Sequence, residues 1–124
     1  MTGYLLRQSF NMSADDLARL QHMLDAAREA ISFAEGKTVK DMIQDRMLLL
    51  SLVKEIEIVG EAASRMSAEA RAAIAGVPWP EIIAMRNRLT HGYFDWDAER
   101  IWTTVKSDLP NLVRLLEQAL SRLS

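Results

Sequence analysis

The sequence predicts an all-α protein: one up-and-down bundle of four to five helices, in a single domain that spans residues 1–124. Apolar residues make up 49% of the chain and are mainly Leu, Ala, Met and Ile, while 6% of residues are aromatic, a palette that favours helices over sheets. All three prolines follow Gly76, so few residues would interrupt a helix before that point. A chain of 124 residues can bury a sizeable core.

The N-terminal part of the chain should form an arm followed by a long helix. Residues 1–12 show no clear period, and we expect a flexible arm or a segment that docks on a partner. The helix should begin after Ser13, a capping residue, with Asp15 and Asp16 near the positive end of its dipole. Gly36 should end it. An apolar stripe at steps of three and four residues comprises Leu17, Leu20, Leu24, Ala27 and Ile31.

A second helix should begin at Thr38 and run to about Met66. Thr38 and Asp41 resemble a capping box with Asp in place of Glu. Residues Met47 to Val53 are apolar in nearly every direction around the axis, which predicts burial both in the core and at a subunit interface. The sequence therefore predicts a homodimer. Gly60 is unfavourable inside a helix and indicates close contact with another helix.

Several polar residues on these two helices have an ordinary structural interpretation. Glu57, Glu61 and Arg65 recur at steps of four, which favours an intrahelical charge ladder over a functional row of carboxylates. His22 falls opposite the apolar stripe, and we expect a structural or idle role. No His-Glu pair on another helix matches the carboxylates, so the sequence supports no metal site in the bundle.

The remaining elements follow from turn residues. Ser67 should start a short third helix that stops at Gly76, and Pro78 to Pro80 forms a rigid connector, with Pro80 as the first residue of a fourth helix. That helix should turn three apolar residues inward, namely Ile82, Ile83 and Leu89.

Residues 95–97 (Asp95, Trp96 and Asp97) should cap the last helix, which Pro110 should kink rather than end. Its apolar stripe comprises Trp102, Val105, Leu109, Leu112, Leu116, Leu120 and Leu123.

The residues best suited to chemistry lie together at the end of the fourth helix. Arg86 carries a permanent planar cation that suits a phosphate, and His91 can exchange a proton near neutral pH. Asn87 lies four residues before His91 and could orient its imidazole, and Tyr93 offers a hydroxyl just beyond Gly92. Arg86 and His91 converge only if the helix ends at residue 90 or 91, or if two subunits bring their copies together. Spacing alone leaves a second interpretation open, in which the cations and His91 merely satisfy the helix C-terminus.

Composition narrows the class of protein. The chain has no cysteine, which excludes disulfides and thiolate metal sites and fits a reducing cytoplasm. No apolar run reaches the length of about 20 residues needed for a membrane span, and Met1 to Phe10 lacks the order of a signal peptide. The net charge of −2 argues against a protein that coats nucleic acid, so any RNA contact should be confined to a local pocket.

The motif that begins at Arg86 resembles that of a known family. Arg86, four residues, His91, Gly92 and Tyr93 resemble the RX4HXY motif of the HEPN superfamily, specifically of the HepT-type toxins. Further segments that resemble recurrent segments of that group are residues 16–24, 57–63, 85–87 and 108–110.

The resemblance implies an HEPN-like bundle that dimerises and places two motifs along a shared cleft. It implies a metal-independent endoribonuclease that needs no cofactor, acts in the cytoplasm on RNA rather than DNA, and has no membrane partner. It further implies a toxin–antitoxin pair, in which a minimal nucleotidyltransferase (MNT) antitoxin silences the toxin by transferring AMP to Tyr93.

The resemblance also gives the motif residues their roles. His91 would act as general base or acid, and Arg86 would bind the scissile phosphate and stabilise the charge of the transition state. Asn87 would position either residue. The alternative is a non-catalytic HEPN module that docks on a nucleotidyltransferase. The acidic net charge favours the module, whereas the presence of Arg86 together with His91 argues against it.

Overall fold

The computed structural model describes residues 12–91 and 96–123. Its helices are α2 (Ala14–Ala34), α3 (Val39–Gln44), α4 (Arg46–Arg65), α5 (Ala68–Ala73), α6 (Trp79–Thr90), α7 (Ala98–Thr103) and α8 (Leu109–Leu123), with a π-helical turn at Thr104–Asp108. The described residues contain no strand, which confirms the predicted all-α class. None of the helices in these ranges is long and apolar enough to cross a bilayer. The predicted N-terminal arm lies outside the described residues.

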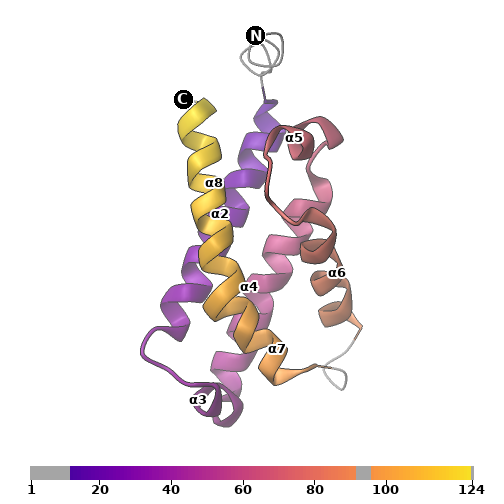
Figure 1. Ribbon diagram of the computed structural model, residues 1–124. Coiled ribbons are helices and arrows are strands. Elements are labelled where there is room, and N and C mark those ends of the chain that lie inside the picture. The colour runs from indigo at the N-terminus through magenta and orange to yellow at the C-terminus, as the bar shows by residue number, and fades with distance from the viewer. Residues whose placement is uncertain (1–11, 92–95, 124) are drawn as a thin grey trace.

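Helix α4 is central to the bundle. It packs against α2 and against α6, and α8 packs against α2, so the long helices run side by side (Figure 1). Side chains from every helix from α2 to α8 and from the π-helical turn meet in one apolar core. The largest fully buried residues are Leu20, Met23, Leu24, Met42, Leu52, Val59, Ile101, Val105 and Leu116.

Helix α2 begins and ends as predicted, and its buried face agrees with the predicted stripe in part. The Ser13 hydroxyl accepts a hydrogen bond from the Asp16 N–H (3.0 Å), and Gly36 has φ 73° just after the helix. Leu17 is 39% exposed and Ile31 is half-buried, contrary to the predicted stripe. Leu20, Leu24 and Ala27 are buried as predicted. The buried face also includes Ala26, Ala30 and Ala34, small residues that let α2 approach its neighbours closely.

The predicted second helix is two helices, and the break is at Asp45. This residue is extended (φ −114°, ψ 97°), and it is both the C-cap of α3 and the N-cap of α4. Its carboxylate accepts a hydrogen bond from the Leu48 N–H at 3.2 Å, which starts a new helix where the sequence indicated continuation. The capping box of Thr38 and Asp41 is confirmed.

The apolar segment Met47 to Val53 is divided between the core and the surface. Leu48, Leu52 and Val53 are buried, whereas Met47 is 81% exposed and Leu50 41% exposed. Ile43, one turn earlier on α3, is 56% exposed. We call Ile43, Met47 and Leu50 the apolar patch. The patch agrees with the expectation that this segment serves more than its own core, and the homodimer stays a prediction.

The short helix α5 and the start of α6 lie close to the predicted positions. Ser67 caps α5, as expected, and the helix gives way to a turn before Gly76. Pro80 is the second residue of α6 rather than the first. The inward face of α6 is formed by Trp79, Met85 and Leu89, while Ile82 and Ile83 are only half-buried.

The C-terminal helix departs from the prediction around Pro110. Asp97 caps α7 by accepting a hydrogen bond from the Arg100 N–H (3.2 Å), while Asp95 lies outside the described residues. Pro110 has no N–H and crowds the carbonyl four residues before it. The chain widens into a π-helical turn, in which the Leu109 N–H donates to the Thr104 carbonyl five residues earlier. Val105, Leu109, Leu112 and Leu116 are buried as predicted, Trp102 and Leu120 are half-buried, and the Leu123 side chain is outside the described set.

Candidate active site

An open groove of about 540 Å³ lies where α2, α4 and α6 meet. Its lining combines basic and acidic side chains with a small apolar floor. The lining residues are Asp15, Ala18, Arg19, His22, Lys54, Glu57, Ile58, Glu61, Ala62, Arg65, Arg86 and Thr90. The groove therefore offers several cations to an anionic ligand, and its carboxylates limit the total positive charge.

Arg86 is placed in this groove by Gly60. A Cβ built on Gly60 would lie 2.2 Å from the Arg86 Cβ and 3.2 Å from the Ile82 carbonyl oxygen. The backbones of α4 and α6 can approach this closely only because position 60 has no side chain, which confirms the helix contact predicted there. The Arg86 side chain crosses over Gly60 and remains 25% exposed.

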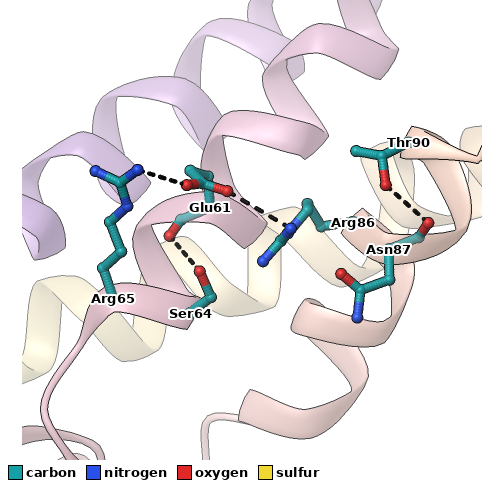
Figure 2. Close-up of polar contacts among 6 residues, drawn as sticks. All are labelled: Glu61, Ser64, Arg65, Arg86, Asn87 and Thr90. Carbon is teal, nitrogen blue, oxygen red and sulfur yellow. Dashed lines mark hydrogen bonds and ion pairs between the residues drawn. The ribbon is translucent and has the colours of Figure 1, made fainter.

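The Arg86 guanidinium faces an acidic residue on α4. Its Nη1 atom lies 3.7 Å from Glu61 Oε2, and Arg65 Nη2 lies 2.9 Å from Glu61 Oε1 (Figure 2). The predicted ladder is thus confirmed for Glu61 and Arg65, but Glu61 also reaches across to the candidate catalytic arginine. The Arg86 Nε atom is buried and has no hydrogen-bond partner among the described residues.

His91 lies at the end of α6, beyond the groove lining. The helix ends at Thr90, and His91 is its C-cap (φ −79°, ψ −1°), with its N–H donating to the Arg88 carbonyl at 3.4 Å. Thr90 lines the groove, whereas His91 is exposed and is not one of the lining residues. The helix therefore ends where convergence would require, but a single chain does not bring Arg86 and His91 together within the groove.

The two supporting residues of the motif have different outcomes. Asn87 is exposed, and its backbone carbonyl accepts a hydrogen bond from the Thr90 hydroxyl at 2.9 Å (Figure 2). Among the described residues no hydrogen bond joins Asn87 to His91, so its orienting role stays a prediction. Tyr93 and Gly92 lie outside the described residues. Trp96, three residues after Tyr93 in the sequence, donates its indole N–H to the Leu89 carbonyl (3.1 Å).

Sequence reasoning missed that His22, Arg19 and Lys54 share a groove with Arg86. A signal was present: Asp15, Arg19 and His22 recur at steps of three and four and lie on one helix face. Which neighbouring helix that face adjoins depends on tertiary packing, and the sequence alone does not give it. In the part of the chain that the structure covers, no three His, Asp or Glu side chains are grouped so as to hold a metal ion.

Comparisons with known proteins identify the family of the chain. The family described as Ribonuclease HepT-like matches residues 23–119. "Putative RNase TTE0752" of Caldanaerobacter subterraneus subsp. tengcongensis is 32% identical over 103 residues, which cover 83% of this chain and 92% of that protein. "Putative RNase MJ1380" of Methanocaldococcus jannaschii is 32% identical over 107 residues, covering 86% of this chain and 98% of that protein.

A third relative carries the family's own name. "Probable ribonuclease HepT" of Thermococcus cleftensis is 27% identical over 107 residues, which cover 86% of this chain and 92% of that protein. No solved structure gives a significant match to this chain. The family match spans more than half of the chain, and these relatives align along most of their own length. The chain therefore belongs to the HepT-like ribonuclease family and is an endoribonuclease with an all-α, HEPN-like fold.

Proposed function

We propose that this ribonuclease is the toxin of a toxin–antitoxin pair, that it cleaves RNA without a metal ion through Arg86 and His91, and that AMP on Tyr93 silences it. The observation that carries the proposal is the position of Arg86. Its guanidinium lies in a groove lined by further cations, and α6 ends at Thr90 of the same lining, so His91 follows at once. The groove is therefore suited to hold a phosphate, and a group that can transfer a proton follows its lining directly in the chain.

The reaction uses groups that RNA itself carries. The 2′-hydroxyl loses its proton to a neutral His91 imidazole and attacks the adjacent phosphorus. The phosphorus–O5′ bond breaks, and a protonated imidazole supplies the proton that the leaving 5′-oxygen takes up. Arg86 stabilises the extra negative charge on the phosphoryl oxygens in the transition state. The products are a 2′,3′-cyclic phosphate and a 5′-hydroxyl end.

A second copy of the chain completes the site in this proposal. Arg86 and His91 are five residues apart, which places them about 140° apart around an ideal helix. One phosphate can therefore meet an arginine from one copy and a histidine from the other, along a cleft shared by the dimer. The exposed apolar patch (Ile43, Met47 and Leu50) supports such an assembly, because exposed apolar groups gain free energy on association.

The proposed control acts on the same phosphate site. A cognate minimal nucleotidyltransferase would transfer the AMP group of ATP to the Tyr93 hydroxyl and release pyrophosphate. Tyr93 lies two residues beyond His91, so the added phosphate would compete with RNA for the positive charge of Arg86. Peptide mass spectra after incubation with that enzyme and ATP should show added AMP on the peptide that contains Tyr93 and not in Tyr93→Phe.

RNA cleavage by the purified chain tests the proposal. The wild-type protein should cleave cellular RNA in the presence of a chelator and leave cyclic-phosphate ends, and Arg86→Ala and His91→Ala should each abolish cleavage at unchanged helicity. Arg88→Ala, which removes a neighbouring exposed cation, should stay active. Expression of the wild-type chain alone should arrest growth, and His91→Ala should not. Arrest that persists with both motif variants would instead support a module that acts by binding a nucleotidyltransferase.

A further inference from the structure

The carboxylate of Glu61 lies between two guanidinium groups, one on its own helix and one on α6. Arg65 approaches Glu61 Oε1 to 2.9 Å, while Arg86 remains 3.7 Å from Glu61 Oε2 (Figure 2). We propose that Glu61 is a positioning residue for Arg86 and that Arg65 limits how tightly Glu61 holds it. The inference rests on the proposed function, in which Arg86 binds the scissile phosphate.

Arg86 needs such a residue because only part of its side chain is fixed by packing. The stem is confined where it crosses Gly60, since the Arg86 Cγ would lie 2.9 Å from a Cβ at that position. The terminal Nη atoms lie beyond this close contact, so a polar group is needed to fix their orientation. Glu61 follows Gly60 directly in α4 and presents its charge to the Nη1 atom. The close contact and the orienting charge therefore come from two adjacent residues.

The unequal distances leave Arg86 available for a ligand. At 3.7 Å the Arg86 contact is an ion pair beyond hydrogen-bond length, whereas the Arg65 contact has the length of a charged hydrogen bond. Arg65 thus partly neutralises the Glu61 carboxylate, and the N–H groups of Arg86 remain able to donate hydrogen bonds to a ligand. When Arg86 binds a phosphate, Glu61 keeps its ion pair with Arg65, so the Glu61 carboxylate still has a countercharge.

Two single variants should have opposite kinetic signatures. Glu61→Gln removes the charge that orients Arg86, so kcat should fall about tenfold, the order of a small misplacement of a catalytic group, while KM is unchanged or lower. Arg65→Ala leaves Arg86 as the carboxylate's remaining cation, so Glu61 should hold Arg86 more tightly and compete with RNA. KM should then rise about three- to tenfold at unchanged kcat.

The double variant tests the coupling between the two residues. If Arg65 acts through Glu61, Arg65→Ala should have no further effect in the Glu61→Gln background. If Arg65 instead binds RNA itself, Arg65→Ala should raise KM equally in the wild-type and the Glu61→Gln backgrounds. That result would overturn the role assigned to Arg65. Binding of an oligonucleotide with 2′-deoxy residues, which lacks the nucleophile, reports the same coupling without cleavage. Arg65→Ala should weaken that binding, and Glu61→Gln should restore it.

Matched controls separate positioning from general charge effects. Glu69→Gln makes the same change of charge at an exposed position of α5, outside the groove, and should alter kcat less than about twofold. Glu61→Asp keeps the charge on a shorter stem and should recover part of the kcat lost in Glu61→Gln. Unfolding curves should show that all variants are folded.

The outcomes also separate this inference from the proposed function. If the wild type cleaves RNA and His91→Ala does not, but Glu61→Gln cleaves like Glu69→Gln, the positioning role is wrong and the proposed function stands. If the wild type does not cleave RNA, the proposed function fails, and the binding measurements still decide the coupling. If wild type, Arg65→Ala and the double variant then bind the 2′-deoxy oligonucleotide equally well, the proposed coupling between Arg65 and Glu61 is wrong.

Discussion

Gly60 and Arg86 bring α4 and α6 into close contact: a Cβ added at Gly60 would lie 2.2 Å from the Arg86 Cβ. Real Cβ atoms do not approach another carbon to this distance, so one helix would have to move. Because Arg86 binds the phosphate in our proposal, the packing of the bundle and the position of the candidate catalytic cation depend on the same absent side chain.

Gly60→Ala should therefore destabilise the protein and impair RNA cleavage. In a helix without such a contact, Gly→Ala stabilises by about 1 kcal/mol, so the opposite sign identifies the steric effect. We expect a loss of about 1–3 kcal/mol in the free energy of unfolding, the usual range for overpacking, measured by urea unfolding. Ser64→Ala, one turn later on the same helix, should be near neutral. A Gly60→Ala protein as stable and active as the wild type would contradict the account.

Asp16→Ala should destabilise the link between α2 and α5. The buried Asp16 carboxylate accepts hydrogen bonds from the Ser67 N–H (2.9 Å) and from the Ser67 hydroxyl (2.7 Å), 51 residues later. The backbone N–H of Ser67 is the main cause that holds the pKa of Asp16 below its usual 3.8. Removing the carboxylate leaves that N–H without its acceptor, at a cost of about 1–3 kcal/mol.

The pH dependence of this effect has a definite sign. A lowered pKa means that the unfolded chain binds the proton more readily than the folded one, so the stabilisation is present above pH 3.8 and is lost on further acidification. Urea unfolding should show a large difference between Asp16→Ala and wild type at pH 7 and a smaller one below pH 3. Asp15→Ala, at the exposed neighbouring position, should have little effect at either pH. An equal difference at both pH values would exclude the ionised carboxylate as the cause.

Glu55→Gln should stabilise the protein at pH 8. Burial is the main cause that raises the pKa of Glu55 from 4.5 to about 7, and the nearby Glu29 carboxyl acts in the same direction. The folded state then holds a proton that the unfolded state releases, so stability should fall as the pH rises from about 4.5 to about 7.

Glu55→Gln should remove this loss of stability. Its free energy of unfolding at pH 8 should exceed that of the wild type by about 1–3 kcal/mol. At pH 4, where the carboxyl is protonated in both states, the two proteins should have similar stability. Thermal or urea unfolding between pH 4 and 8 measures this, with Glu57→Gln as the control. A wild-type profile that rises through this window in a Glu55-dependent way would show that the carboxyl is ionised in the fold.

Met47→Glu should weaken self-association, if the apolar patch is the interface that we propose. Met47 is 81% exposed, so a charge there is well solvated in the monomer and is desolvated only in an assembly. Light scattering should show a dimer for the wild type and a shift toward monomer for the variant, with unchanged helicity. Leu17→Glu, at an apolar position on α2 that is 39% exposed, is the control. A variant that remains fully dimeric would place the interface elsewhere.

The local signals in the sequence predicted much of the fold. Ser13, Thr38, Ser67 and Asp97 each cap a helix as expected, because a capping side chain bonds to a backbone N–H only three residues away. Asp45 was missed because an Asp can either continue a helix or cap a new one, and tertiary packing selects the extended, capping conformation. The π-helical turn before Pro110 was missed for a similar reason. A proline inside a helix distorts the preceding turn, but whether the distortion is a kink or a π-helical turn depends on the neighbouring helices.

The candidate site was predictable only in part. Arg86 could be singled out because its neighbours in sequence are suited to the same chemistry. The pairing of Arg86 with Glu61 and the presence of His22 in the groove depend on which helix faces meet, and residues 25 or more apart in sequence do not reveal that. The spacing predicted the ion pair of Glu61 with Arg65 within α4, and the position of α6 adds the contact of Glu61 with Arg86.

The most direct test of the central claim is the cleavage activity of a mixture of two inactive variants, Arg86→Ala and His91→Ala. The two proteins should be mixed, allowed to exchange subunits, and assayed on RNA with each variant alone as a control. If the site combines Arg86 of one copy with His91 of the other, each mixed dimer contains one intact site, and random exchange should restore about a quarter of the wild-type activity. A mixture that forms mixed dimers and stays inactive would contradict a cleft shared by two copies.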